Sequence, residues 1–539
     1  MNNYFRTLVR KEGLSFPVRA LTAMFAVSPP SSTLISQPLF HLSMKGARTA
    51  VLFVLLLLFS SLSLAVLSVN KGDLKTALTN EESPMEVIVP LGQANVAGFQ
   101  EGSIYTNTTL SSSLEMDSHT CAILDNGDLK CWGSDVKGQL GDGGSNTNTN
   151  APSSTAIDLG TGRTAVAVSA GDRYTCAILD NGDMKCWGYD FKGQLGDGGS
   201  NTNTNAPSST AIDLGTGRTA VAVSAGAYHT CAILDNSDLK CWGWDDYGQL
   251  GDGGTNTDTN APSSTAIDLG TGRTAVAMST GETHTCAILD NGKAKCWGRD
   301  LFGQLGDGGS NTATNAPSST TIDLGTGRTM AVSERDLDGD GVLNIFDSTP
   351  YPPTTNPPNP LPQRNVAGFQ EGSIFTNSTL SSGGYHTCAI LDDGSVSCWG
   401  RNLLGQLGEG TTLDRTTPTQ TSSLGTGRTA VAITSGDHHT CAILDDGSVS
   451  CWGYNNKGQL GDGTTTDRNT PTQTSSLGTG RTAVAISAGS DHTCAVIVTE
   501  GDTGEYYGAE VKCWGENGDG QLGDGTDTFR LTPTAIEIE

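Results

Sequence analysis

The sequence has little positive charge. Its 539 residues include 31 Lys and Arg against 57 Asp and Glu, which gives a formal net charge of −26. Residues 1–69 hold six of the basic and one of the acidic residues, so residues 70–539 keep 25 and 56 and carry a net charge of −31. Nucleic-acid binding requires a basic surface that neutralises phosphates, and an anionic membrane surface would also repel this chain. We therefore expect no nucleic-acid partner, while cationic ligands and divalent metals stay open.

Charged residues (16%) and aromatic residues (6%) are scarce, and the chain contains 70 glycines. Much of its polarity therefore lies in uncharged Gly, Ser, Thr and Asn. Glycine and β-branched residues are weak helix formers, which disfavours long helices. The composition favours many short strands joined by turns, and the length alone permits two to four ordinary domains.

Catalytic motifs are missing as well. The sequence contains no nucleophile elbow, no P-loop and no HExxH, which are common markers of enzyme sites. Most carboxylates recur in every repeat at turns, where Asp and Asn form local hydrogen bonds. No repeat contains a CxxC pair, which disfavours zinc. We expect no catalytic residues and no enzyme.

An apolar run lies near the start of the chain. Residues 50–69 follow Lys45 and Arg48, and a basic stretch before an apolar one is typical of a secretory signal or a membrane anchor. Residues 63–65 (Ser-Leu-Ala) fit a cleavage site, and Met44 fits the true start of translation. The expected divisions are an upstream extension (1–43), a signal peptide or anchor (44–69) and a linker (70–94).

One unit of sequence occurs seven times. The segment Cys121–Gly143 recurs 55 residues apart at Cys176, Cys231 and Cys286, and 53 residues apart at Cys388, Cys441 and Cys494. Each unit is expected to form about four short strands, which in the second unit are residues 164–170, 175–179, 184–187 and 209–214. Four strands repeated radially predict an all-β fold, a seven-bladed β-propeller. A linear solenoid is the alternative.

All 14 cysteines fall in these units, two in each. A three-residue hairpin loop over residues 125–127, with Gly127 left-handed, places Cys121 opposite Cys131 at a distance that a disulfide bridges. The seventh unit has a longer hairpin tip and keeps its pair. Disulfides are typical of an oxidising compartment. The predicted pairs are Cys121–Cys131, Cys176–Cys186, Cys231–Cys241, Cys286–Cys296, Cys388–Cys398, Cys441–Cys451 and Cys494–Cys513.

The segment HTCAILDNGDLKCWGSDVKGQLGDG resembles the repeat of the regulator of chromosome condensation family. The characteristic parts are His119-Thr120, Cys131-Trp132-Gly133 and residues 138–143. The resemblance covers residues 95–539 apart from one insertion and implies a seven-bladed propeller of the exported, cysteine-paired type. The founding nuclear member exchanges nucleotide on a small GTPase. This chain departs from it in charge, cysteines and export signal, so nucleotide exchange is not expected. Other members are binding proteins, and a fold does not fix a function.

One position of the repeat is nearly always histidine. Tyr174 replaces it in the second unit. A metal-binding ring or a pH switch is one interpretation, but the favoured one is that each histidine forms a hydrogen bond within its own unit. The tryptophan of each Cys-Trp-Gly segment is expected in the core. The histidines are His119, His229, His284, His386, His439 and His492.

Two short segments vary among the otherwise similar units. They are the four residues after Cys-Trp-Gly and the two residues before His-Thr or Tyr-Thr. Propeller symmetry would place them in a ring on one face, where aromatic residues and Arg are common binding anchors. Drift at unconstrained loop tips is the alternative. The candidate binding residues are Arg173, Tyr189, Tyr228, Trp244, Arg299, Tyr385, Arg401, His438 and Tyr454.

An insertion, residues 333–364, separates the fourth unit from the fifth. Residues 336–347 match a calcium loop, with acids at positions 1, 3, 5 and 12 and Gly at position 6, and resemble thrombospondin type 3 and dockerin repeats. The loop ends in Asp rather than Glu and has no evident helical flanks, so an acidic linker is the alternative. Residues 349–362 are rich in proline and indicate a stiff spacer. The expected Ca²⁺ ligands are Asp336, Asp338, Asp340, Val342 through its carbonyl, Asn344 and Asp347.

Residues 365–380 repeat residues 95–110, so the chain holds two homologous blocks, 95–332 with four units and 365–539 with three. We expect one ring, with two partial propellers as the alternative. The expected function is a secreted or cell-surface binding module that recognises a protein or a glycan through the variable loops. An enzyme, a lyase or hydrolase acting at the central channel, and a structural envelope protein are the alternatives.

Overall fold

The computed structural model describes residues 110–113, 117–124, 126–309, 312–331, 379–500 and 506–538. All of them fall in one compact unit, residues 93–539. The predicted leader (44–69) and the predicted calcium loop (336–347) lie outside the described residues. Over the described ranges, no helix has the length and apolar character needed to cross a membrane.

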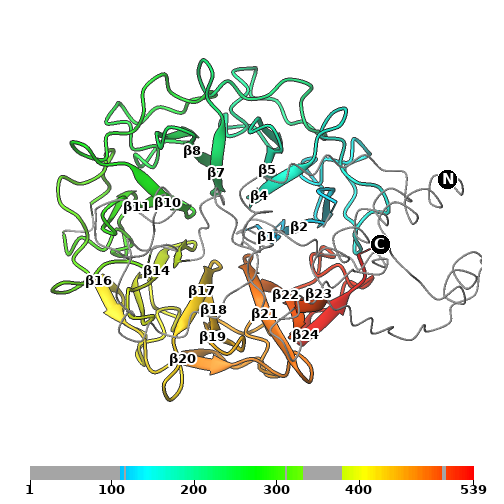
Figure 1. Cartoon of the computed structure of the whole chain (residues 1–539), viewed down its shortest axis with the longest axis vertical. Coiled ribbons are helices and arrows are strands. Elements are labelled where there is room, and N and C mark those ends of the chain that lie inside the picture. Colours follow the sequence, from blue (N-terminus) through cyan, green and yellow to red (C-terminus); the bar gives the residue numbers. More distant parts are fainter. Residues whose placement is uncertain are drawn as a thin grey trace, which may run out of the picture. The chain divides into compact units, whose positions relative to one another are not determined.

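Seven antiparallel sheets stand in chain order around a ring (Figure 1). Each sheet belongs to one sequence unit, and its first strand lies nearest the centre. Sheets 1 to 4 have three strands each: β1 (Leu110–Ser112), β2 (His119–Ile123), β3 (Leu129–Gly133); β4 (Ala165–Gly171), β5 (Tyr174–Leu179), β6 (Met184–Gly188); β7 (Ala220–Ala225), β8 (His229–Leu234), β9 (Leu239–Gly243); β10 (Ala275–Thr280), β11 (His284–Leu289), β12 (Ala294–Gly298). Sheets 5 to 7 have four: β13 (Leu380–Ser382), β14 (His386–Ile390), β15 (Val396–Gly400), β16 (Arg415–Gln420); β17 (Ala430–Ser435), β18 (His439–Leu444), β19 (Val449–Gly453), β20 (Arg468–Gln473); β21 (Arg481–Ala488), β22 (His492–Glu500), β23 (Tyr506–Gly515), β24 (Arg530–Ile536).

The central hairpin of each sheet has the predicted register. In sheet 1, Cys121 lies opposite Cys131, and the N–H of Leu124 donates to the carbonyl of Asp128 over 2.8 Å. Gly127, with a φ of 81°, supplies the left-handed position of the turn. The predicted disulfides are confirmed, because all 14 cysteines are joined in the seven expected pairs.

The prediction of about four strands in each unit is wrong for sheets 1 to 4, which have three, and sheet 2 shows the reason. Residues 209–214 are not a strand, and the only backbone hydrogen bonds between the outer segment and β6 are a bridge between Gly188 and Thr204 and a bond from Ile212 N–H to the Met184 carbonyl. In sheet 6 the outer segment is attached to β19 at the same two places, through Arg468 and Thr474. The residues between these two attachments pair with β19 as strand β20. The segment in sheet 2 spans the same attachments with two more residues, so it bulges away instead of pairing.

Hydrogen bonds between neighbouring inner strands close the ring. In each sheet a backbone N–H near the end of the first strand donates to a Ser or Thr hydroxyl of the preceding sheet. The seventh bond returns from Ser112 in β1 to Ser487 in β21, over 3.0 Å. The other six join Ala170 to Ser111, Ala225 to Ser169, Thr280 to Ser224, Ser382 to Ser279, Ser435 to Ser381 and Ala488 to Thr434.

The two homologous blocks share sheet 5. Met330, from the first block, pairs with Leu391, and Leu380, from the second block, pairs with Ala389 in the next part of the same inner edge. In sheet 2 the continuous strand β4 fills the corresponding positions. Residues 332–378 therefore fall, in sequence, between neighbouring positions of one inner strand. The chain forms one ring, and the alternative of two partial propellers is wrong.

A second set of bonds joins each unit to the next. Nε2 of His119 lies 2.7 Å from Oγ1 of Thr175, and that hydroxyl donates to the carbonyl of Gln139 over 2.8 Å. Trp187 donates to the same carbonyl over 3.0 Å. The seven tryptophans are fully buried, as expected. The prediction that each histidine bonds within its own unit is wrong, because the partner threonine belongs to the next unit.

Candidate functional site

The two variable segments of each unit lie side by side. In sheet 2 the N–H of Tyr189 donates to the carbonyl of Arg173 over 2.8 Å, and in sheet 3 Trp244 donates to Tyr228 over 2.8 Å. The same bond recurs in every sheet because the second strand begins opposite the end of the third. We call this side of the ring the loop face. Its third-strand loops are residues 134–137, 189–192, 244–247, 299–302, 401–404, 454–457 and 516–519.

Aromatic rings on the loop face form a continuous series across sheets 2 and 3. The ring centroid of Tyr189 lies 6.3 Å from that of Phe191 and 6.1 Å from that of Tyr228. Tyr228 meets Trp244 edge-on at 5.6 Å, and Trp244 meets Tyr247 at 5.4 Å. Such edge-to-face spacing is favourable for aromatic pairs.

Two arginines continue the series into sheets 4 and 5. The guanidinium of Arg299 lies 4.7 Å from the ring centroid of Tyr247 and 5.9 Å from that of Tyr385. Arg401 lies 5.0 Å from the ring of Phe302 and 5.6 Å from that of Tyr385. Guanidinium groups are attracted to aromatic faces at these distances. We call the whole series, Tyr189, Phe191, Tyr228, Trp244, Tyr247, Arg299, Phe302, Tyr385 and Arg401, the aromatic arc.

Six of the nine candidate binding residues lie in the arc, and three do not. Arg173 pairs with Asp117 at 2.5 Å and lies 3.7 Å from Asp172, so its charge is directed toward carboxylates. His438 and Tyr454 form a separate ring pair with centroids 6.3 Å apart.

Sequence reasoning missed Phe191, Tyr247 and Phe302. They stand at the third or fourth position of loops whose first residue was already a candidate, and counting every aromatic residue in those loops would have found them. The third loop position also carries exposed apolar side chains: Val136, Phe191, Leu301 and Leu403 are 45–67% exposed. The loop face thus combines half-buried rings with projecting apolar groups.

Two acidic side chains lie beside the arc. Burial raises the pKa of Glu282, although a hydrogen bond from Tyr385 and the charges of Arg299 and Arg401 lower it. Burial also raises the pKa of Asp172 to about 6, while the charge of Arg173 and the neighbouring Tyr228 hydroxyl lower it. Glu282 is therefore the carboxyl group that lies close to both arginines of the arc.

Comparison with known proteins supports the fold and the repeat. One family model, the regulator of chromosome condensation (RCC1) repeat, matches residues 181–233, 241–288, 393–443 and 446–496. A second model of the same description matches all seven units, at residues 117–139, 165–194, 220–249, 275–304, 378–406, 430–459 and 483–521.

Curated relatives and solved structures agree with these matches. The chain is 30% identical over 394 residues to the ultraviolet-B receptor UVR8 of Arabidopsis thaliana, an alignment covering 70% of this chain and 82% of UVR8. It is 26% identical to the human E3 ubiquitin-protein ligase HERC2 over 69% of this chain, but that match spans only 7% of HERC2. The structure of Prp20p from Saccharomyces cerevisiae has a TM-score of 0.56 at 19% identity, covering 76% of this chain and 86% of that one. With seven matched repeats in a closed ring of seven sheets, the chain belongs to the regulator of chromosome condensation (RCC1) repeat family.

Proposed function

We propose that this propeller is a binding module that recognises a protein through the aromatic arc. The observation that carries the proposal is the unbroken series of rings and guanidinium groups across four neighbouring sheets. Rings that contact one another lose little conformational freedom when a partner covers them, and Trp, Tyr and Arg dominate binding hot spots. Drift at unconstrained loops would not favour a series of nine side chains in which each contacts at least one other member.

Protein partners suit this fold and charge. Prp20p, which has a similar fold, is described with binding properties toward Gsp1p and histones, so a propeller of this kind can present a protein-binding surface. The net charge of −31 over residues 70–539 opposes a nucleic-acid partner. The exposed apolar side chains of the third loop position favour a partner with an apolar surface.

We further propose that the module works outside the cytoplasm and is not an enzyme. The seven disulfides support an oxidising compartment, and the apolar run at 50–69 supports export or anchoring. The expected calcium loop at 336–347 would then meet abundant extracellular calcium.

The test uses the full-length protein immobilised against material from its own culture. Capture by the native protein is compared with capture by a Tyr228→Ala and Trp244→Ala double variant. Phe529→Ala is the matched control, because Phe529 is 45% exposed but lies outside the arc. We expect a protein that the native chain and the control retain, and whose retention falls at least tenfold, about 1.4 kcal/mol, with the double variant.

Two outcomes would contradict the proposal. Equal capture by the double variant would remove the arc as the binding surface. Loss of capture after enzymatic removal of glycans from the bound protein would identify a glycan rather than a protein surface as the ligand.

A further inference from the structure

A pair of positions on the loop face differs between the two blocks of the chain. In units 5 to 7 the second residue of the third-strand loop is Asn402, Asn455 or Asn517, and the residue that pairs with the end of the third strand is arginine. In units 1 to 4 the corresponding residues are Asp135, Asp190, Asp245 and Asp300, with Thr149, Thr204, Thr259 and Thr314 in place of arginine. In all seven units an acidic residue, called the loop acid, stands seven positions after this Asn or Asp.

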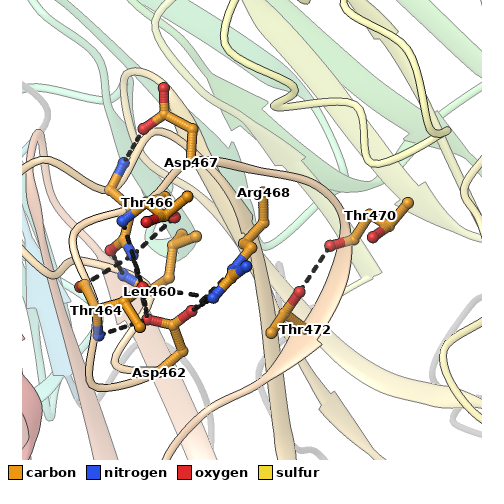
Figure 2. A network of polar contacts seen from close by, with 9 residues as sticks. Leu460, Asp462, Thr464, Thr466, Asp467, Arg468, Thr470 and Thr472 are labelled. Atoms are coloured by element: carbon orange, nitrogen blue, oxygen red, sulfur yellow. Dashed lines mark hydrogen bonds and ion pairs between the residues drawn. The ribbon is translucent and has the colours of Figure 1, made fainter.

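In units 5 to 7, the arginine neutralises this acid, as Figure 2 shows for unit 6. Arg468 pairs with Asp462 at 2.7 Å, and the carboxylate is 3% exposed. Oδ1 of Asn455 accepts from Leu460 N–H, and its Nδ2 donates to Asp462 and to the carbonyls of Thr464 and Thr466. The amide of Asn455 and the guanidinium of Arg468 thus both donate to Asp462. Units 5 and 7 repeat the ion pair through Arg415–Glu409 and Arg530–Asp524.

In units 1 to 4, the same place contains acceptors without a cation. Oδ1 of Asp135 accepts from Leu140 N–H over 2.9 Å, the bond that Asn455 makes in unit 6. By analogy, its Oδ2 occupies the position of the asparagine Nδ2, which in unit 6 donates to the loop acid. Burial raises the pKa of Asp135, the hydrogen bond from Leu140 lowers it, and the charge of the loop acid Asp142 raises it. Unit 1 therefore has two acidic groups where unit 6 has an amide donor and an acid, and it has Thr149 in place of the guanidinium that neutralises the acid in unit 6.

Several buried oxygen atoms at these positions in units 1 to 4 have no hydrogen-bond partner. Asp135, Asp190 and Asp245 have no exposed surface, and their Oδ2 atoms have no hydrogen-bond partner. The threonine hydroxyl at the arginine position is also buried without a partner in all four units. A buried carboxylate oxygen with no partner is costly. The loop acids Asp142, Asp197, Asp252 and Asp307 are exposed, so an ion from solvent can reach each place.

We propose that units 1 to 4 each bind a hard divalent cation, calcium, between the two aspartates and beside the threonine hydroxyl, where units 5 to 7 carry arginine. The four aspartate pairs are Asp135 with Asp142, Asp190 with Asp197, Asp245 with Asp252, and Asp300 with Asp307.

Calcium suits this set of ligands. It accepts six to eight oxygen ligands in flexible geometry, from carboxylates, carbonyls, hydroxyls and water. No cluster of three or more His, Cys, Asp or Glu side chains suited to a metal occurs in the described ranges, so loop carbonyls and water would complete each shell. Few protein ligands and an open side give weak sites, of the affinity found in extracellular modules, on the order of 10⁻⁴–10⁻³ M.

The proposed ions would stiffen the loops that carry the aromatic arc. Asp190 stands between Tyr189 and Phe191, and Asp245 directly follows Trp244. Calcium at these positions would hold the loop backbone through an aspartate side chain next to an arc residue. The calcium sites stand on their own observations and do not depend on what the arc binds.

The binding test must separate these sites from the expected calcium loop. The parent for the test is therefore the full chain with Asp336→Asn, Asp338→Asn and Asp340→Asn, which removes that loop's carboxylates. Calcium binding is measured at pH 7.5 by equilibrium dialysis with radioactive calcium up to about 5 mM, above the affinity range of weak extracellular sites. We expect about four bound ions per chain in this parent.

The decisive variant changes Asp135, Asp190, Asp245 and Asp300 to Asn. Asparagine is the residue that units 5 to 7 carry at this position, so the ring is expected to fold, and a thermal melt checks it. We expect the four ions to be lost. The reverse variant, Asn455→Asp with Arg468→Thr, is expected to add one bound ion by rebuilding the aspartate pair in unit 6.

The proposal is overturned if the folded parent binds no calcium in this range. That result is expected if the aspartates are protonated or bonded to water instead of to an ion. It is also overturned if the fourfold Asp→Asn variant binds as many ions as the parent. Unchanged binding by the reverse variant would show that the aspartate pair and threonine do not make a site.

Discussion

The repeated histidines act as uncharged hydrogen-bond donors between neighbouring sheets. Nε2 of His284 lies 2.9 Å from Oγ1 of Thr387 in the next unit, and this hydroxyl also contacts the Gln304 carbonyl at 3.2 Å. Because the hydroxyl proton goes to the carbonyl, Nε2 must carry the ring proton. Burial lowers the pKa of His284 to about 3. Tyr174 performs the same bridging in unit 2, with its hydroxyl 3.0 Å from that of Thr230.

Exchanging His284 for tyrosine should weaken the pH dependence of stability. The folded pKa of about 3 lies below the ordinary 6.5, so the unfolded chain takes up a proton first as the pH falls. Each such histidine therefore removes stability between about pH 6.5 and pH 3. From pH 7 to pH 5, His284→Tyr should lose about 2 kcal/mol less unfolding free energy than the native chain.

The measurement is denaturant unfolding at both pH values. Buried carboxyls with raised pKa values, such as Asp172, act in the opposite direction, but they are common to both chains and cancel in the comparison. Equal losses in the two chains would show that His284 is not held neutral by burial.

At the scale of the element, the hairpin with its disulfide is the part that sequence spacing determined most fully. The pairs in six units span 10 residues, and the pair in unit 7 spans 19. The register of β22 and β23 keeps Cys494 opposite Cys513 despite the longer tip. Three of the four predicted strands of unit 2 were also right. The fourth prediction was wrong. The residues are of the types found in strands, but the outer segment has two residues more than the paired segment of sheet 6 between the same attachments, so it bulges away.

Removing a hairpin disulfide should destabilise the protein by an amount that rises with the logarithm of the length of the loop it closes. In the chain-entropy account, the Cys388→Ala and Cys398→Ala double variant should lose about 2.5–3 kcal/mol. The Cys494→Ala and Cys513→Ala double variant should lose about 0.5 kcal/mol more, because its loop is longer. Unfolding free energies from denaturant titration check both values. A smaller loss in unit 7 than in unit 5 would contradict the entropic account.

At the scale of the whole molecule, the described residues close the ring by side-chain and backbone contacts between unit 7 and unit 1. Unit 7 ends in its own sheet, and its loop docks on unit 1: the carbonyl of Gln521 accepts from Thr120 and Trp132. Gly523, with a φ of +72°, lies against the Trp132 indole, where an added Cβ would come within 2.6 Å of Nε1. Every other pair of neighbouring units is joined by the same loop.

Gly523→Ala should open this junction. Gly525→Ala is the matched control: its φ is +77°, but no atom lies within 4 Å of an added Cβ. Both variants bear the left-handed strain of about 1–2 kcal/mol, and Gly523→Ala should lose a further 1–3 kcal/mol or so from crowding. Hydrogen exchange should rise first in β1, β2 and β23. If the two variants lose equal stability and show equal exchange, the contact with Trp132 does not hold the junction.

The sequence by itself determined the number of units, the cysteine pairs, the hairpin turns and the all-β class, because each depends on spacing within one unit of the chain. Tertiary structure decided everything that passes between units. The histidines bond to the next sheet, Met330 and Leu380 share an inner strand across the insertion, and Phe191, Tyr247 and Phe302 join the arc. These contacts depend on the rotation from one sheet to the next, and no spacing within a single unit encodes that rotation.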